Sequence, residues 1–150
     1  MGLLGWISGL LKPGRGGASG GGPALRWKGD GRFSVDAVGE ARYQTSLSTI
    51  AGGRSDDGRQ VNSEATLRFE PDNPHDRNAV AVFIGGAKIA YLRREDAVTY
   101  HAATRRLKVH GQDIGCAARV VGGAMGESGG TSDFAVKLDI AEPFQLVDPH

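Results

Sequence analysis

The stretch from Glu70 to Leu92, which reads EPDNPHDRNAVAVFIGGAKIAYL, constrains the fold more than any other part of the chain. Its second half contains two short apolar runs, 79–84 and 87–92, on either side of Gly85 and Gly86. Two runs of this length around a two-glycine reversal are typical of a β-hairpin. The first half is a polar turn with two prolines, so the sheet would fix the ends of a stiff loop that presents its side chains. The sequence therefore predicts a polar cluster mounted at the mouth of a hairpin.

Further elements are predicted on both sides of this hairpin. Alternation of apolar and polar residues predicts strands at 32–38, 61–70, 113–121 and 133–140. Helices are predicted at 39–51, which is followed by two glycines, and at 93–107, which has acidic residues in its first turn and arginines in its last. Five or six short strands with two helices favour a mainly β fold (α+β by content), most simply a small antiparallel sheet curled into a barrel.

The length of 150 residues fits one folded domain with tails. Residues 1–24 form an apolar leader followed by a Gly/Ser-rich linker, a composition that buries too little surface to fold. We expect the domain to span 25–147, with 148–150 as a tail and an extended conformation from residue 142 onward.

The apolar part of the leader is about ten residues long, against the roughly 20 that a membrane-spanning helix needs. It also lacks the basic start and the cleavage site of a secretory signal. We expect no obligatory membrane association, with a short surface anchor as the alternative. The single cysteine, Cys116, cannot form an internal disulfide and indicates a reducing compartment, which predicts a cytoplasmic protein.

Charge and motifs exclude several classes of function. A net charge of +1 is too small for a protein that coats nucleic acid through charge alone, although it allows a few phosphate contacts. The sequence lacks zinc-ligand spacing, a GxSxG motif, a Cys–His signature and a P-loop. It therefore predicts no catalytic residues, no metal and no cofactor.

The polar turn has a simple structural explanation for some of its residues. Pro74 biases Asn73 toward an extended backbone, and short polar side chains such as Asn73 and Asp76 bond neighbouring backbone amides. His75 is harder to explain in this way, because its position at a loop tip predicts an exposed ring. An exposed flat ring beside a carboxylate can stack on a nucleobase while the acid accepts a hydrogen bond from a hydroxyl group.

The run EPDNPHDRNAVAVFIGGAKIAYLRREDA closely resembles the core motif of the HIRAN domain family. The family pattern is an acidic residue, Pro, Asn-Pro-aromatic-Asp, then Asn-Ala-Val/Ile, a strand, a short turn, and Gly-Tyr/His-Leu with basic residues after it. A weaker resemblance extends over about 33–146. The resemblance implies an OB-like (or SH3-like) antiparallel β-barrel with two helices, and recognition of single-stranded DNA at a 3′-hydroxyl end.

Carried over by position, the resemblance assigns nucleic-acid-binding roles to Arg42, Tyr43, Asn73, His75, Asp76, Tyr91, Arg94 and Phe134. The aromatic residue of the turn, here His75, would stack on the terminal base, and Asp76 would contact the 3′-hydroxyl. The Arg42–Tyr43 pair would hold the base and the backbone. Tyr91 and Arg94 would contact phosphate, and Phe134 would be a further stacking residue.

Each assignment outside the turn has a structural alternative. Tyr91 could sit at the rim of the core, and Phe134 within the core. Tyr43 could anchor its helix to the barrel, and Arg94 could be a solvated residue at a helix end.

These observations lead to three hypotheses about function. The first is a non-catalytic module that binds single-stranded DNA at its 3′ end, with a possible protein partner in DNA repair or replication. The second is a protein-interaction module that keeps the fold and has lost DNA binding, which the His75 substitution for the usual tyrosine favours. The third, with the least support, is a nuclease or other hydrolase that uses Asp72, His75 and Asp76.

Overall fold

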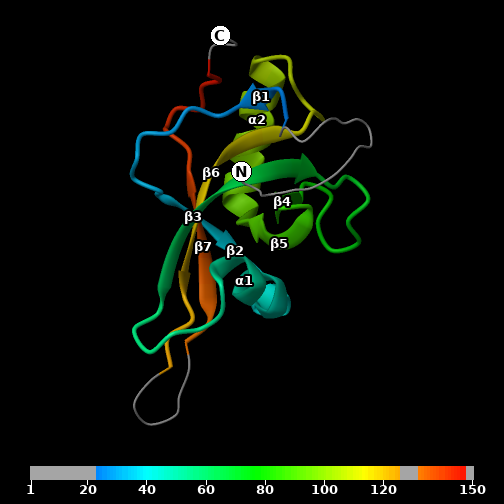
Figure 1. Ribbon diagram of the computed structural model, residues 1–150. Coiled ribbons are helices and arrows are strands. Elements are labelled where there is room, and N and C mark those ends of the chain that lie inside the picture. The colour runs from blue at the N-terminus through cyan, green and yellow to red at the C-terminus, as the bar shows by residue number, and fades with distance from the viewer. Residues whose placement is uncertain (1–22, 126–131, 148–150) are drawn as a thin grey trace.

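The computed structural model describes residues 23–125 and 132–147 (Figure 1). The expected leader, nearly all of the linker and the tail at 148–150 lie outside these residues. No helix in the described part of the chain has the length and apolar character needed to cross a membrane.

Within residues 23–125 and 132–147, the fold contains seven strands and three helical segments. In chain order these are β1 (Leu25–Arg26), β2 (Val35–Val38), the 3₁₀ helix η2 (Glu40–Tyr43), α1 (Gln44–Ala51), β3 (Arg59–Phe69), β4 (Val80–Ile84), β5 (Ala87–Leu92), α2 (Arg94–Arg106), β6 (Ile114–Gly122) and β7 (Phe134–Asp139). The hairpin and the second helix lie where the sequence predicts them.

Six antiparallel strands close into a barrel in the order β6-β3-β4-β5-β2-β7, and β7 returns to pair with β6. The short β1 lies outside the ring and pairs with β6 in parallel. This arrangement confirms the prediction of a small, mainly β, OB-like barrel with two helices. Figure 1 shows β3, β6 and β7 continuing below the barrel as a ribbon, with α1 against it.

Alternation along β3 shows why this sequence closes around a core. Ala65 and Leu67 face inward and are buried, whereas Glu64 and Arg68 face solvent. From the other elements, the core receives residues such as Val80 and Val82 of β4, and α1 and α2 contribute Leu47 and Tyr100. One continuous apolar cluster therefore joins the strands and both helices.

Three expected boundaries differ from the structure. The predicted strand at 32–38 is regular only from Val35, because residues 29–33 form a loop around Asp139. The predicted helix at 39–51 begins as η2, and β3 begins at Arg59 rather than at residue 61. Gly39, with φ of 79°, separates β2 from η2.

Residues 142–147, where the sequence predicts an extended conformation, are packed against the domain rather than projecting from it. Phe144 is buried and packs edge-on against Trp27 and Tyr100, with ring centroids 5.0 and 5.8 Å away. Leu146 forms a β-bridge with Trp27. The free energy of this aromatic packing offsets the conformational entropy that is lost when the segment is ordered. Composition alone does not show that Phe144 has such partners.

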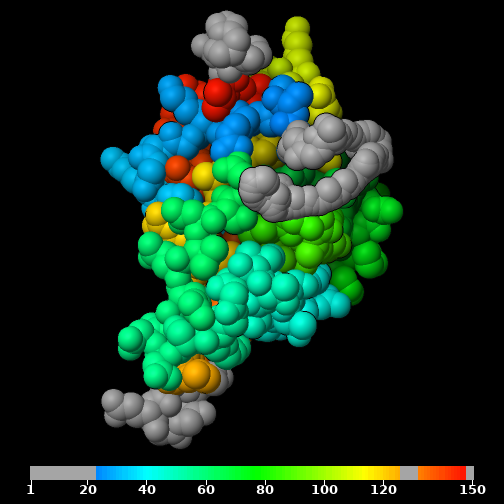
Figure 2. Space-filling model, viewed as in Figure 1, coloured from blue at the N-terminus to red at the C-terminus, as the bar shows by residue number. Residues whose placement is uncertain are grey.

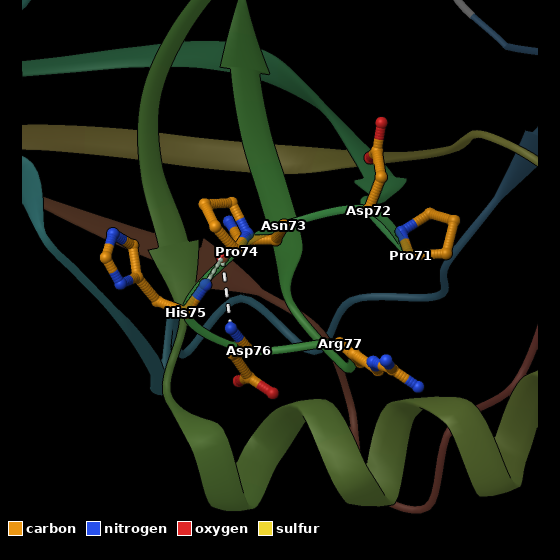
Figure 3. A pocket seen from close by; sticks show the side chains of 7 residues that line it. All are labelled: Pro71, Asp72, Asn73, Pro74, His75, Asp76 and Arg77. Carbon is orange, nitrogen blue, oxygen red and sulfur yellow. Dashed lines mark hydrogen bonds between the residues drawn. The ribbon is translucent and has the colours of Figure 1, made fainter.

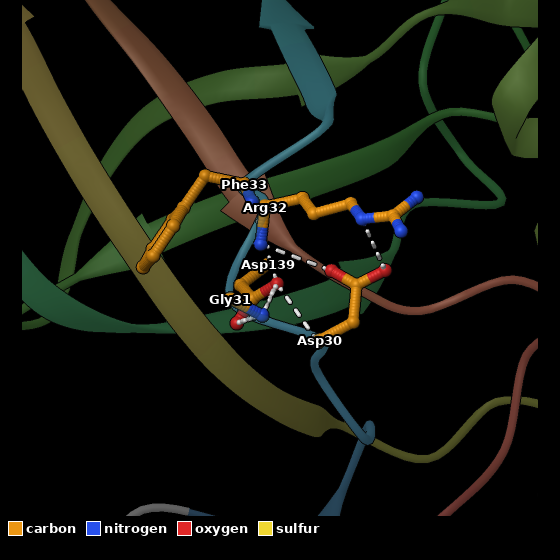
Figure 4. A network of polar contacts seen from close by, with 5 residues as sticks. All are labelled: Asp30, Gly31, Arg32, Phe33 and Asp139. Carbon is orange, nitrogen blue, oxygen red and sulfur yellow. Dashed lines mark hydrogen bonds and ion pairs between the residues drawn. The ribbon is translucent and has the colours of Figure 1, made fainter.

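The carboxylate of Asp139, at the end of β7, holds the loop that leads into β2 (Figure 4). It accepts hydrogen bonds from the backbone N–H groups of Asp30 at 3.1 Å, Gly31 at 3.0 Å and Phe33 at 3.4 Å. Burial alone would raise the pKa of this carboxyl, but the backbone donors outweigh it, so the pKa lies below its usual value. A Cβ on Gly29 would lie 2.4 Å from the same carboxylate, so only glycine fits there.

We predict that Asp139→Asn lowers the free energy of unfolding at pH 7 by about 1–3 kcal/mol, because a charged acceptor for backbone donors is lost. Since the folded-state pKa is depressed, this stabilisation is present above about pH 4 and is lost as the pH falls through the folded pKa. Urea unfolding from pH 7 down to pH 3 should therefore show the two proteins converging. The control is Asp36→Asn, which removes an exposed ion pair with Lys137 and should cost less than about 1 kcal/mol. A pH-independent difference would contradict this account.

Candidate functional site

The turn between β3 and β4 forms a surface pocket of about 480 Å³ (Figure 3). The residues around it are consecutive: Pro71, Asp72, Asn73, Pro74, His75, Asp76 and Arg77. The pocket is therefore made by one loop, and its shape depends on how that loop is held.

Asn73 organises the loop from within. Its Oδ1 accepts hydrogen bonds from the backbone N–H groups of His75 at 2.9 Å and Asp76 at 3.1 Å. The Asp76 side chain makes a similar bond, in which its Oδ1 accepts a hydrogen bond from the backbone N–H of Asn78 at 2.9 Å. These bonds confirm the expectation that short polar side chains stiffen the turn. Asp72 forms no side-chain hydrogen bond to any described residue.

Glu70, at the base of the turn, joins it to β5. Its Oε1 accepts hydrogen bonds from Asn73 Nδ2 and from the Tyr91 hydroxyl, both at 3.0 Å. Its Oε2 lies 2.5 Å from Lys88 Nζ, which also donates to the Tyr91 hydroxyl at 2.9 Å. Three donors from two segments thus converge on one partly buried carboxylate.

The convergence of donors on Glu70 shifts the pKa values of Glu70 and Lys88. Burial alone would raise the pKa of Glu70, but the hydrogen bonds from Lys88, Asn73 and Tyr91 outweigh it and lower the pKa. The hydrogen bond to Glu70 is the largest cause of the raised pKa of Lys88. Glu70 is therefore ionised and Lys88 charged at neutral pH, and the pair stays intact there.

Helix α2 anchors the turn from the other side. Arg94, its first residue, donates from Nη2 to the backbone carbonyl of His75 at 3.2 Å. The buried His101 lies 2.9 Å from the carbonyl of Asn78 through Nε2, which must donate because a carbonyl can only accept. His101 is not among the site residues predicted from the sequence, although it lies four positions after Ala97 on the buried face of α2.

The side chains at the tip point in different directions. Figure 3 shows the His75 ring turned to the opposite side of the loop from Arg77, and the Asp76 carboxylate directed toward α2. His75 is exposed, and one Asp76 oxygen has no hydrogen-bond partner among the described residues. The fixed backbone of the turn therefore presents an aromatic ring and a carboxylate oxygen that can still accept a hydrogen bond.

The other predicted site residues on this side lie on neighbouring elements. Tyr91 is paired with Val38 in the β2–β5 ladder, and η2 packs against β5. Arg42 on η2 is exposed, while Tyr43 is partly buried against the core. Figure 2 shows the cyan surface of η2 and α1 directly below the green surface of the hairpin region. Tyr91 acts mainly inside the fold, since its hydroxyl is bonded to Lys88 and Glu70.

Phe134 does not belong to this group. Its side chain is fully buried, and a Cβ on Gly123 would lie 2.3 Å from its ring. The Gln44 side chain bonds both the N–H and the carbonyl of Phe134, at 2.8 and 3.0 Å, and so fixes the edge of β7 there. The structure thus corrects the prediction of a stacking role and supports the alternative of a core residue.

Comparisons of the chain with protein-family models, with curated proteins and with solved structures find no significant match. The resemblance to the HIRAN motif stays a prediction. Within residues 23–125 and 132–147, no group of three or more His, Cys, Asp or Glu side chains is arranged to hold a metal ion.

We predict that Phe134→Ala lowers the free energy of unfolding by about 3–5 kcal/mol, because it leaves a cavity between β7 and Gly123. Urea unfolding followed by tryptophan fluorescence measures this change. The half-buried Phe33, which lies under the Arg119 guanidinium, serves as the control, and Phe33→Ala should cost clearly less. A small loss of stability for Phe134→Ala would contradict its assignment to the core.

Proposed function

We propose that this chain is a non-catalytic module that binds single-stranded DNA at an end carrying a 3′-hydroxyl. The observation that carries the proposal is the turn at 71–77, where an exposed His75 ring and the Asp76 carboxylate lie on a backbone held by three contacts. The resemblance of this turn to the HIRAN motif supports the same reading. Glu70, Arg94 and His101 provide the three anchors.

The ring and the carboxylate suit the two parts of a strand end. A nucleobase stacked on the His75 ring would contribute on the order of 1–3 kcal/mol. The oxygen of Asp76 that is not used by Asn78 can accept a hydrogen bond from a terminal hydroxyl. A terminal phosphate would instead bring a second negative charge against that carboxylate, so the site should discriminate between the two ends.

Exposed cations near the turn can contact the backbone of the strand. Arg77 and Arg94 lie on or beside the turn, and Arg42 lies on η2 beyond Tyr91. One or two stacked bases with a few phosphate contacts would give an affinity of roughly micromolar strength. The slope of log K against log salt should be shallow, about −0.7 for each phosphate neutralised.

A protein-interaction module is the second candidate. It is favoured because several polar side chains of the site already have hydrogen-bond partners inside the protein. Tyr91 bonds Lys88 and Glu70, and Arg94 bonds the His75 carbonyl. A turn of this kind is a stable scaffold even without a nucleic-acid ligand. Binding of oligonucleotides decides between the two candidates.

We predict that fluorescence anisotropy shows tighter binding to a short labelled oligonucleotide with a 3′-hydroxyl than to the same strand with a 3′-phosphate. His75→Ala should weaken binding to both by roughly tenfold, because the stacking surface is removed. Asp76→Asn should reduce the preference by improving binding to the phosphate end, because the repelling charge is gone.

The matched control is Asp72→Asn, which removes an equal charge from the same turn at a residue without a side-chain hydrogen bond among those described. It should preserve the preference for the hydroxyl end. Equal binding of the wild-type chain to both ends would contradict end recognition. Absence of binding by the folded protein would favour the interaction module.

A further inference from the structure

Glu70 stands outside the turn that would contact a ligand, yet it bonds the residue that shapes that turn. It follows Phe69, the last residue of β3, and its backbone N–H donates to Ala79 across the base of the loop at 2.9 Å. Its side chain is only 18% exposed. Burying a carboxylate to this extent is costly unless its oxygens are bonded, and here both are.

A continuous chain of hydrogen bonds leads from Glu70 to the two residues at the tip. Asn73 donates from Nδ2 to Glu70, and this bond fixes which way the Asn73 amide faces. The opposite atom of the same amide, Oδ1, then accepts the N–H groups of His75 and Asp76. If the amide turned over, Nδ2 would face those two donors and both bonds would be lost.

The other end of the chain is fixed in the barrel. Lys88 and Tyr91 belong to β5, a strand paired on both edges, and their polar groups hold the Glu70 carboxylate in place. Lys88 also neutralises Glu70, so the carboxylate adds little repulsion toward a phosphodiester strand nearby. The barrel thus determines the geometry of the tip through one side chain.

We propose that Glu70 is a positioning residue, which sets the backbone of His75 and Asp76 through Asn73 and thereby the preference for one kind of strand end. This inference rests on the proposed function for its ligand, although the effect on the turn itself does not. A residue that merely stabilised the fold would change the melting temperature and leave the preference between ends unaltered.

The first measurement is amide hydrogen exchange of His75 and Asp76 by NMR, which needs no ligand. Glu70→Ala should raise the exchange rates of both amides at least about tenfold, because Asn73 no longer has a fixed acceptor. The matched control is Glu64→Ala, since Glu64 is an ion-paired glutamate on β3 whose partner is Arg26, away from the turn. It should leave both rates unchanged.

The second measurement is a double-mutant cycle on the ratio of affinities for the 3′-hydroxyl and 3′-phosphate oligonucleotides. If Glu70 acts through Asn73, Glu70→Ala and Asn73→Ala should each reduce the ratio by a similar factor, about threefold or more, and the double variant should be no worse than either. Should Glu70→Ala fail to fold, Glu70→Met replaces it in the cycle, because it has a similar length and also removes the oxygen acceptor for Asn73.

The positioning role would be overturned if amide exchange in Glu70→Ala is unchanged. It would also be overturned if the double variant reduces the ratio of affinities by the product of the two single effects, because the two residues would then act independently. If the wild-type chain binds neither oligonucleotide, the proposed function fails, and amide exchange alone still decides whether Glu70 fixes the turn. The two failures are therefore distinguishable.

Discussion

Closure of the sheet at β6 is the constraint on which the rest of the molecule depends. This strand pairs with β3 along one edge, while β7 and β1 share the other, so it joins the two ends of the ring. An open sheet would leave an unpaired edge and would not enclose the apolar cluster. Because β3 is held by β6 over most of its length, its C-terminal end emerges at a fixed place. Glu70 and the turn at 71–77 follow directly, so the base of the turn is held in place by the barrel.

Polar contacts then carry that rigidity from the barrel to the tip of the turn. Glu70 connects to β5, whereas Arg94 and His101 connect to α2, so the loop is braced by elements on both sides. Surface loops usually make few contacts of this kind and are more mobile than the elements they connect. A loop that is held in this way and still presents the His75 ring and an unbonded oxygen of Asp76 is pre-organised, which would lower the entropy cost of binding a ligand there.

Local patterns in the sequence were enough to predict the hairpin, α2 and the stiffness of the turn, since each depends on residues close together in the chain. Gly85 and Gly86 adopt positive φ, and Asn73 bonds amides two and three residues ahead. Long-range features were not accessible in this way. The docking of Phe144 on Trp27 joins the two ends of the domain. The burial of Phe134 depends on which face of β7 closes the barrel, and the role of Glu70 depends on the register that brings β5 beside it.

The central claim is that the face formed by the turn and η2 receives the end of a single strand. The most direct test is to titrate ¹⁵N-labelled protein with a short oligonucleotide that ends in a 3′-hydroxyl and to follow backbone amide shifts. The account predicts that the largest changes fall on residues 71–77 and on Arg94, with smaller ones on Arg42 and Tyr43. Changes centred on the outer face of β3 and β6, or no changes at saturating oligonucleotide, would contradict it.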